Sequence, residues 1–217
     1  MRVRAGFPAK MLNQPSGLVS ISQALTMRPT VLDRVCYATW NGGVGNWNVA
    51  GNWTPAQVPN NGTPPGTTYN VLIDNGNVLN SSVSLNIVAT IDNLTIDAGD
   101  SLGINHGQVL TLNSDGGVTA GTITNNGSFA LNSAGALTEL RLTGTGNVTL
   151  RGSGTLTLSN NVNNLIRDTD ATQQRLVHAA GRTIQGAGQL GVNSMALTNR
   201  GTIIANQTNA LPLTPML

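Results

Sequence analysis

Charged side chains are scarce in this sequence. Lys, Arg, Asp and Glu make up 9% of its 217 residues, whereas ordinary soluble domains carry about 25%. Asn, Thr, Ser and Gly replace them, which is unusual for a cytosolic enzyme with a charged surface. The chain is nevertheless not predicted to be disordered, because Leu, Ile and Val occur in nearly every short segment between Val71 and Ile204. Disordered chains are poor in such residues.

Cysteine and long apolar runs are also missing. Cys36 is the only cysteine, which excludes an intrachain disulfide. No run reaches the roughly 18 apolar residues that a membrane-spanning helix needs. Residues 1–38 offer the basic start of a signal peptide and a small residue at Ala38, but they lack its continuous apolar stretch. We predict that residues 1–38 are a poorly structured leader or an incorrect start site.

Positive charge is confined to the same stretch. Residues 1–36 hold five basic residues and one acid, whereas residues 37–217 hold six arginines and eight acids. The net charge of +2 therefore arises from the N-terminal stretch. Because the rest of the chain has no basic patch, no nucleic-acid partner is expected.

Aromatic residues make up only 3% of the chain, and the tryptophans are clustered. Trp40, Trp47 and Trp53 lie within residues 39–68, among Asn-Gly and Gly-Asn pairs and four prolines that mark turns. We interpret residues 39–68 as a Trp/Gly/Pro-rich N-terminal cap over one end of the structure that follows. The alternative is that the three rings form an exposed, coplanar platform for stacking on sugars.

From Tyr69 onward, aliphatic residues alternate with polar ones over short runs. This period of two is typical of half-buried β-strands. Gly, Asn, Asp or Ser interrupts every run, and Gly and Asn tolerate the positive φ of sharp corners. Residues 170–180 are the exception, where we expect a helical turn or an outward loop. The positions expected to face inward are Tyr69, Val71, Ile73, Val83, Leu85, Ile87, Leu94, Ile96, Leu110, Leu112, Leu140, Leu142, Val148, Leu150, Leu156 and Leu158.

Weak internal copies of a strand–corner–strand unit accompany this alternation. Ile123-Thr-Asn-Asn-Gly-Ser-Phe-Ala recurs as Leu197-Thr-Asn-Arg-Gly-Thr-Ile-Ile. Gly144-Thr-Gly-Asn-Val-Thr-Leu recurs from Gly152 and, more loosely, from Gly186. Degenerate copies of this kind are typical of solenoids.

These features predict an all-β fold, a right-handed parallel β-helix (solenoid) whose coils are formed by residues 69–217 beneath the N-terminal Trp-rich cap. Strands of three or four residues with single-glycine corners suit such coils. A β-sandwich, the alternative, prefers strands of about five or six residues joined by hairpins. No closing element follows Thr202-Ile-Ile-Ala, so we expect the coils to be truncated at the C-terminus, and the open edge to promote self-association.

A resemblance to known families supports this interpretation. The strings Leu197-Thr-Asn-Arg-Gly-Thr-Ile and Gly144-Thr-Gly-Asn-Val-Thr-Leu look like the coil repeats of β-helical passenger regions in bacterial autotransporter-like and exosortase-sorted surface proteins. The resemblance covers about residues 39–210 and implies export, cell-surface exposure and often adhesion. One run in this chain resembles the start of such regions; it comprises Trp40, Trp47, Asn52-Trp53, Pro59, Val71 and Ile73. No clear signal peptide or sorting tail accompanies it, so anchoring in the outer membrane or cell wall is expected to use parts that are not in this chain.

Few residues offer nucleophilic or metal chemistry. His106 and His178 lack the spacing of metal ligands, and we interpret both as exposed loop histidines. A Cys–His nucleophile pair would have to use Cys36, which lies in the predicted leader.

The acids are the stronger candidates. Parallel β-helix polysaccharide lyases and hydrolases use clustered carboxylates for calcium binding or acid–base work, and Asp92, Asp97 and Asp100 lie close in sequence. Asp92 and Asp97 would face opposite sides of one straight strand, because they are an odd number of residues apart. Asp168 and Asp170 form an Asp-x-Asp pair that is compatible with a weak calcium site. We favour turn-forming or solvated roles for all five acids.

We therefore assign no catalytic, cofactor-binding or metal-binding residues and no cofactor. The expected function is that of a non-catalytic, secreted or surface-displayed structural or adhesive β-helix segment, extracellular or on a bacterial cell surface. Its expected partners are host-cell or extracellular glycan and protein surfaces. Two alternatives stay open: a fragment of a carbohydrate-active β-helix enzyme (a polysaccharide lyase or hydrolase), and a carbohydrate-binding module that uses the tryptophans.

Overall fold

The computed structural model describes residues 34–216, apart from residues 75, 77, 116–120 and 170–173. The described residues belong to one compact unit, Val31–Leu217. They form an all-β structure in which the only helical element is a single 3-10 turn, η1 (Ala50–Asn52). The first strand, β1, begins at Arg34, so residues 34–38 are strand rather than leader. The rest of the predicted leader lies outside the described residues.

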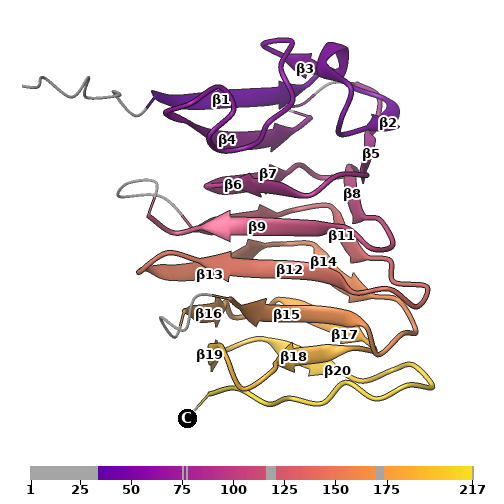
Figure 1. Ribbon diagram of the computed structural model, residues 1–217. Coiled ribbons are helices and arrows are strands. Elements are labelled where there is room, and N and C mark those ends of the chain that lie inside the picture. The colour runs from indigo at the N-terminus through magenta and orange to yellow at the C-terminus, as the bar shows by residue number, and fades with distance from the viewer. Residues whose placement is uncertain (1–33, 75, 77, 116–120, 170–173, 217) are drawn as a thin grey trace, which may run out of the picture. The chain divides into compact units, whose positions relative to one another are not determined.

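Three sheets make up this unit (Figure 1). Sheet A contains β1 (Arg34–Trp40), β3 (Trp53–Thr54), β4 (Thr67–Ile73), β7 (Asn93–Ile96), β10 (Thr122–Asn125), β13 (Asn147–Gly152), β16 (Arg175–His178) and β19 (Ala196–Asn199). Sheet B contains β2 (Val44–Asn46), β5 (Ser82–Leu85), β8 (Ser101–Ile104), β11 (Ser128–Leu131), β14 (Thr155–Leu158), β17 (Thr183–Gly186) and β20 (Thr202–Ile204). Sheet C contains β6 (Ala89–Ile91), β9 (Val109–Asn113), β12 (Thr138–Thr143), β15 (Asn164–Asp168) and β18 (Gln189–Gly191).

The order of the strands shows how the chain winds. From β4 to β20 it visits sheets A, B and C in turn, so each strand pairs with the strand three further along. We call each set of three consecutive strands a coil. The paired strands are parallel except for β1 and β3, which are antiparallel at Thr39–Thr54. The described strands therefore do not form the antiparallel hairpins of a sandwich, and the arrangement is consistent with a β-helix or another solenoid.

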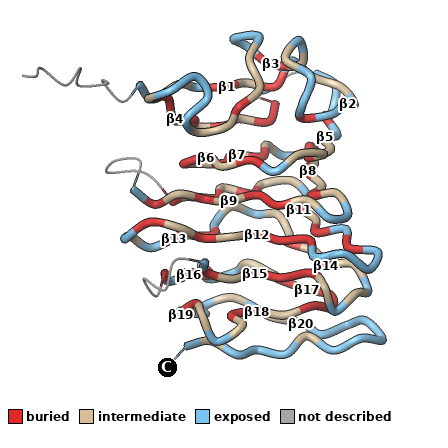
Figure 2. Tube along the Cα trace, viewed as in Figure 1, coloured by how far each residue is buried: buried red, intermediate tan, exposed pale blue. Residues whose placement is uncertain are grey.

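The inward positions stack into columns because paired strands are in register. The predicted alternation is confirmed here: β4 buries every second residue, and all the predicted inward positions except Ile87 are buried. Figure 2 shows buried stretches in every layer of the stack. Each buried Leu, Ile or Val is worth roughly 1.5–3 kcal/mol. One column of sheet B runs Val83, Leu102, Phe129, Leu156, Ile184 and Ile203.

Glycines form the corners between these strands. Gly144, Gly152 and Gly186, which begin the three sequence copies, have φ of 103°, 111° and 125°. They precede β13, β14 and β18, which belong to sheets A, B and C respectively. The repeated unit in the sequence is therefore one corner with one strand, and it serves all three sheets.

The tryptophans pack together at the N-terminal end of the stack. Trp40, Trp47 and Trp53 are buried, and the ring of Trp53 meets the other two edge to face at centroid distances of 5.0 and 4.8 Å. Each indole nitrogen donates to a backbone carbonyl, for example Trp47 Nε1 to Pro59 O at 3.0 Å. The alternative of an exposed sugar-stacking platform is wrong, because no ring face is accessible.

The last residues differ from the expected open end. After β20 the chain returns to sheet C, where Leu190 donates its N–H to Pro212 O at 3.1 Å and accepts from Thr214 N at 2.9 Å. Leu190 and Leu213 form an isolated parallel bridge. Residues 210–214 therefore lie along the outer edge of β18, whereas β19 and β20 remain the last strands of their sheets.

Candidate functional site

A groove of about 470 Å³ lies on the outer face of sheet A. Two outward columns of this sheet form it, because residues that are paired in register point the same way on successive strands. The first column is Tyr37, Asn70, Asn93 and Thr122. The second column is Leu72, Thr95, Thr124 and Arg151.

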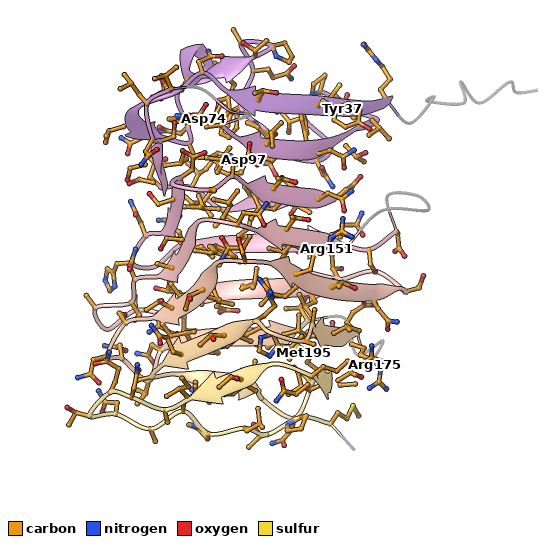
Figure 3. All side chains as sticks on the ribbon, turned by 180° about the vertical axis from the view of Figure 1, so that it is seen from behind. Tyr37, Asp74, Asp97, Arg151, Arg175 and Met195 are labelled. Carbon is orange, nitrogen blue, oxygen red and sulfur yellow. The ribbon has the colours of Figure 1, made fainter. Side chains whose placement is uncertain are left out.

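The groove crosses the strands rather than following one. It extends from β1 to β13, which is four interstrand steps or about 19 Å. Tyr37 stands at the first end with 74% of its surface exposed, and Arg151 stands at the other. In Figure 3, Tyr37, Arg151 and Arg175 lie toward the same side of the stack.

Hydrogen bonds across the sheet order the groove floor. Asn93 Nδ2 donates to Asn70 Oδ1 at 2.7 Å, and Asn93 Oδ1 accepts from the N–H of Thr122 at 2.9 Å. Arg151 Nε donates to Thr124 Oγ1 at 3.0 Å, which lays the guanidinium along the face. The groove therefore presents amides and hydroxyls whose positions are set by strand register.

The groove is positively charged at one end. Within the described part of the chain, the only ion pairs are those of Glu139, so Arg151 and Arg175 have no carboxylate partner there. The outward positions of the sheet A strands are occupied by Asn, Thr, Tyr, Arg and aliphatic residues, without an acid. An unneutralised guanidinium in such a place favours an anionic ligand.

A second polar feature lies on the outer face of sheet C. The side chain of Glu139 is 1% exposed and lies between two arginines, with Arg141 Nε at 2.7 Å and Arg167 Nε at 2.8 Å from the same carboxylate oxygen. Burial alone would raise the pKa of Glu139, but the hydrogen bonds and charges of Arg141 and Arg167 outweigh it and lower that pKa. Each arginine donates two hydrogen bonds to this one acid, so the triad is held together by its own residues.

The two histidines have different surroundings. His106 is exposed in a turn, as predicted, where its Nδ1 accepts from the N–H of Ala134 at 3.0 Å. The prediction for His178 is wrong: it is fully buried in β16, in the inward column that continues from Leu150. The same strand replaces the helical turn or loop expected in residues 170–180, of which 170–173 lie outside the described residues.

His178 is held from one side only. Its Nδ1 lies 2.7 Å from Asn199 Oδ1, and its Nε2 has no partner. Burial lowers the pKa of His178; the bond to Asn199 opposes this and the charge of Arg182 adds to it. Cys36, the only candidate nucleophile, lies on β1, five strand steps or about 24 Å from β16. The structure therefore does not bring a Cys–His pair together.

The structure separates two of the clustered acids. Asp92 and Asp97 flank β7 at opposite ends, about 16 Å apart along the strand. That exceeds the separation of about 5–9.5 Å between the carboxylates of a glycosidase pair. Asp92 is fully buried and accepts from Asn61 Nδ2 at 2.7 Å, while its Oδ2 is unpartnered.

Asp97 lies close to Asp74 (Figure 3), and its N–H donates to Ile73 O at 2.7 Å. Asp100 belongs to the same corner, because its N–H donates to Asp97 O at 3.2 Å. Ser81 bridges Asp74 and Asp100: its hydroxyl donates to Asp74 Oδ2 at 2.6 Å and its N–H to Asp100 Oδ1 at 2.7 Å. Burial raises the pKa of Asp100; the Ser81 N–H opposes this, and the carboxylates of Asp74 and Asp97 add to it. Asp74 and Asp100 are buried, so the corner is closed by its own residues.

Asp168 is likewise internal. It is buried at the end of β15 and accepts from the N–H of Gln174 at 2.8 Å. Asp170 lies outside the described residues. A solvated role is therefore wrong for Asp92, Asp100 and Asp168, whereas a turn-forming role agrees with their positions at corners. Across the residues that the structure describes, no three His, Cys, Asp or Glu side chains are grouped as a metal ion would require.

Comparisons with protein-family models, with curated proteins and with solved structures return no match. The site is therefore characterised by its own geometry. No helix in the described ranges is long and apolar enough to cross a membrane.

Sequence reasoning missed the groove, because its two columns join residues that lie one coil apart. No local signal marked Tyr37, because residues 35–38 (Val-Cys-Tyr-Ala) show no alternation of apolar and polar residues. The outward position of Tyr37 and the register that sets it beside Asn70 come only from the structure.

Proposed function

We propose that this chain is a non-catalytic, surface-displayed β-helix segment that adheres to extracellular surfaces through the outer face of sheet A. The three parallel sheets close, in this proposal, into a right-handed parallel β-helix. Crossover connections between parallel strands of one sheet are right-handed in about 98% of cases, which supports that hand. Each coil would contribute one strand to each face, so a flat face can be extended by adding coils.

The observation that carries the proposal is the groove between Tyr37 and Arg151. It offers a row of amides and hydroxyls that is repeated at the interstrand spacing, and it contains no acid. General acid–base cleavage of a glycan needs a carboxylate or another titratable group near the bound bond. Asp92, Asp100 and Asp168 instead lie at corners or inside the stack, and Glu139 lies on the outer face of sheet C between two arginines; each accepts hydrogen bonds from its own chain.

Extracellular display is supported by composition. A surface of Asn, Thr and Ser does not depend on charge for its solubility. Because the one cysteine is half-buried, the chain does not depend on reducing conditions either. The resemblance of the coil repeats to those of bacterial surface proteins favours the same location. Repeated weak contacts along one face would give useful avidity without a deep pocket.

The test separates adhesion from catalysis. The full chain is incubated with immobilised polysaccharides and extracellular-matrix proteins, and retention is measured alongside the release of new reducing ends or unsaturated uronates. We expect retention without release. Time-dependent release of sugar products would refute the non-catalytic part of the proposal. Display is tested by protease treatment of intact producing cells, where protection of the chain would contradict a surface location.

A further inference from the structure

We infer that the groove on sheet A binds an anionic polysaccharide that runs across the strands, with an acidic group at Arg151. This inference rests on the proposed adhesive function and names its ligand class. It combines three features of the described residues: the direction of the groove, the chemistry of its floor, and the unpaired cation at one end.

The direction of the groove favours a polymer that contacts side chains. A peptide that adds to a sheet needs the unpaired N–H and C=O groups of an edge strand. Strands β4, β7 and β10 are internal to sheet A, so their backbone groups are already paired on both sides. A ligand in the groove therefore meets side chains at each step of about 4.8 Å.

The chemistry of the floor matches sugar hydroxyls. Asn70 Nδ2 and the hydroxyl of Thr95 make no hydrogen bond within the described residues, so both are available to a ligand. Neutral amides and hydroxyls both donate and accept, which suits hydroxyl groups that do the same. Tyr37 adds an exposed aromatic face at one end, against which the apolar face of a sugar ring can pack.

The charge at the other end selects the acidic group. Arg151 uses Nε to hold Thr124, which leaves its two terminal nitrogens without a partner among the described residues. Arg175 lies on the next strand of the same face, where it pairs with Asn147, and it uses Nη1 to hold Thr198 at 3.1 Å. Its position is therefore four residues, or about 13 Å, from that of Arg151 along the strands. Arg151, without a facing acid, suits a carboxylate or sulfate borne on a sugar in the groove, and Arg175 adds a separate positive charge to the same face.

The experiment compares four probes on the full chain by isothermal titration: polygalacturonate, a sulfated glycan, a neutral glucan and poly-glutamate. We expect both anionic glycans to bind at least tenfold more tightly than the neutral glucan, with an affinity that falls as salt rises. Stronger binding of the uronate or of the sulfate identifies which acidic group the site prefers. Equal binding of poly-glutamate would overturn the inference in favour of an acidic protein partner.

Variants locate the site. R151Q should weaken anionic glycan binding by about tenfold or more, R151K should weaken it less, and Y37A should weaken it without changing its salt dependence. R200Q is the matched control, because it removes the same charge from the corner after β19, outside the groove. Circular dichroism melting confirms that each variant is folded.

The outcomes separate this inference from the proposed function. Anionic glycan binding that R151Q and R200Q reduce equally would overturn the inference and leave adhesion intact. Binding of the neutral glucan alone would do the same. Cleavage of any probe would instead refute the non-catalytic function itself.

Discussion

At the residue scale, buried polar groups decide how this protein responds to pH. His178 and Glu139 are both inaccessible to solvent, but different features of their surroundings shift their pKa values. Burial disfavours the charged form of His178, whereas the two arginines favour the charged form of Glu139. Their contributions to stability are therefore lost in different ranges of pH.

Acidification should destabilise the chain through His178. Because the pKa of His178 is lower in the folded state than its usual value of about 6.5, the unfolded state binds the proton more readily. Stability is therefore expected to fall as pH decreases below about 6.5. Thermal unfolding between about pH 7 and pH 5 measures this, and H178Q should flatten the slope. An equal slope in wild type and H178Q would show that another group is responsible.

The Glu139 triad should act at lower pH. The pKa of Glu139 is lowered in the folded state, so its contribution is present above the usual value of about 4.3 and is lost as pH falls through the folded value. E139Q places an amide NH₂ against two guanidinium donors and should cost about 1–3 kcal/mol near neutral pH. R141Q should cost less, because Arg167 still holds the acid. Urea unfolding compares the two, and the reverse order of costs would contradict the shared-acid arrangement.

At the element scale, glycine corners set the path of each coil. The corner at Gly186 is the most constrained, because φ is 125° and an added Cβ would meet the carbonyl of Leu158 on the preceding coil. The corner at Gly181 has a φ of 71° and open space around the same position. Backbone conformation and crowding can therefore be separated at two nearby glycines.

Substitution of these glycines should have unequal effects. G181A should cost about 1 kcal/mol for the left-handed backbone alone. G186A should cost more, about 3 kcal/mol, because a clash with β14 on the preceding coil adds to the backbone strain. Chemical denaturation of both variants gives the comparison. Equal costs would mean that the corner at Gly186 can move away from β14 without penalty.

The strands in the middle of the chain could be predicted from sequence, whereas β1 and β16 could not. Val71, Leu94 and Leu140 sit in clear alternations, and all three are buried as expected. The sequence predicts no strand in residues 34–38 of β1, because the outward residues Val35 and Tyr37 are apolar and hide the period of two. β16 was missed because its inward column places a histidine where the pattern calls for an aliphatic residue.

The groove depends on register, which no local pattern contains. Asn70 pairs with Asn93, and Asn93 pairs with Thr122, each on adjacent strands. The stretch of chain between Asn93 and Thr122 is longer than that between Asn70 and Asn93. Alternation predicts that each of these residues faces outward. Only the lengths of the loops between them decide that they align in one column.

At the scale of the whole described unit, stability is shared between neighbouring coils. Each strand contacts mainly the strands of the coils on either side, as in other stacked repeats. The middle coils are covered on both sides, whereas β19 and β20 are the last strands of their sheets. Opening should therefore begin at an end rather than in the middle.

Hydrogen exchange measured by mass spectrometry tests this gradient. Amides of β19 and β20 should exchange first, and amides of β10 and β11 last. L131A, in the middle of the stack, should cost about 2–5 kcal/mol and speed exchange on both sides of β11. Uniform exchange along the chain would indicate one cooperative unit instead.

The unequal coils and the polar residues inside them have a further effect on folding. Identical turns could each dock on the wrong neighbour, one layer too early or too late. Here Asn125 reaches Thr155 on the following turn, and Asn164 reaches Ser133 on the preceding one. A misplaced layer would leave such amides buried and unbonded, which is costly. These interior contacts differ from one layer to the next, so they favour the observed pairing of layers over a misplaced one.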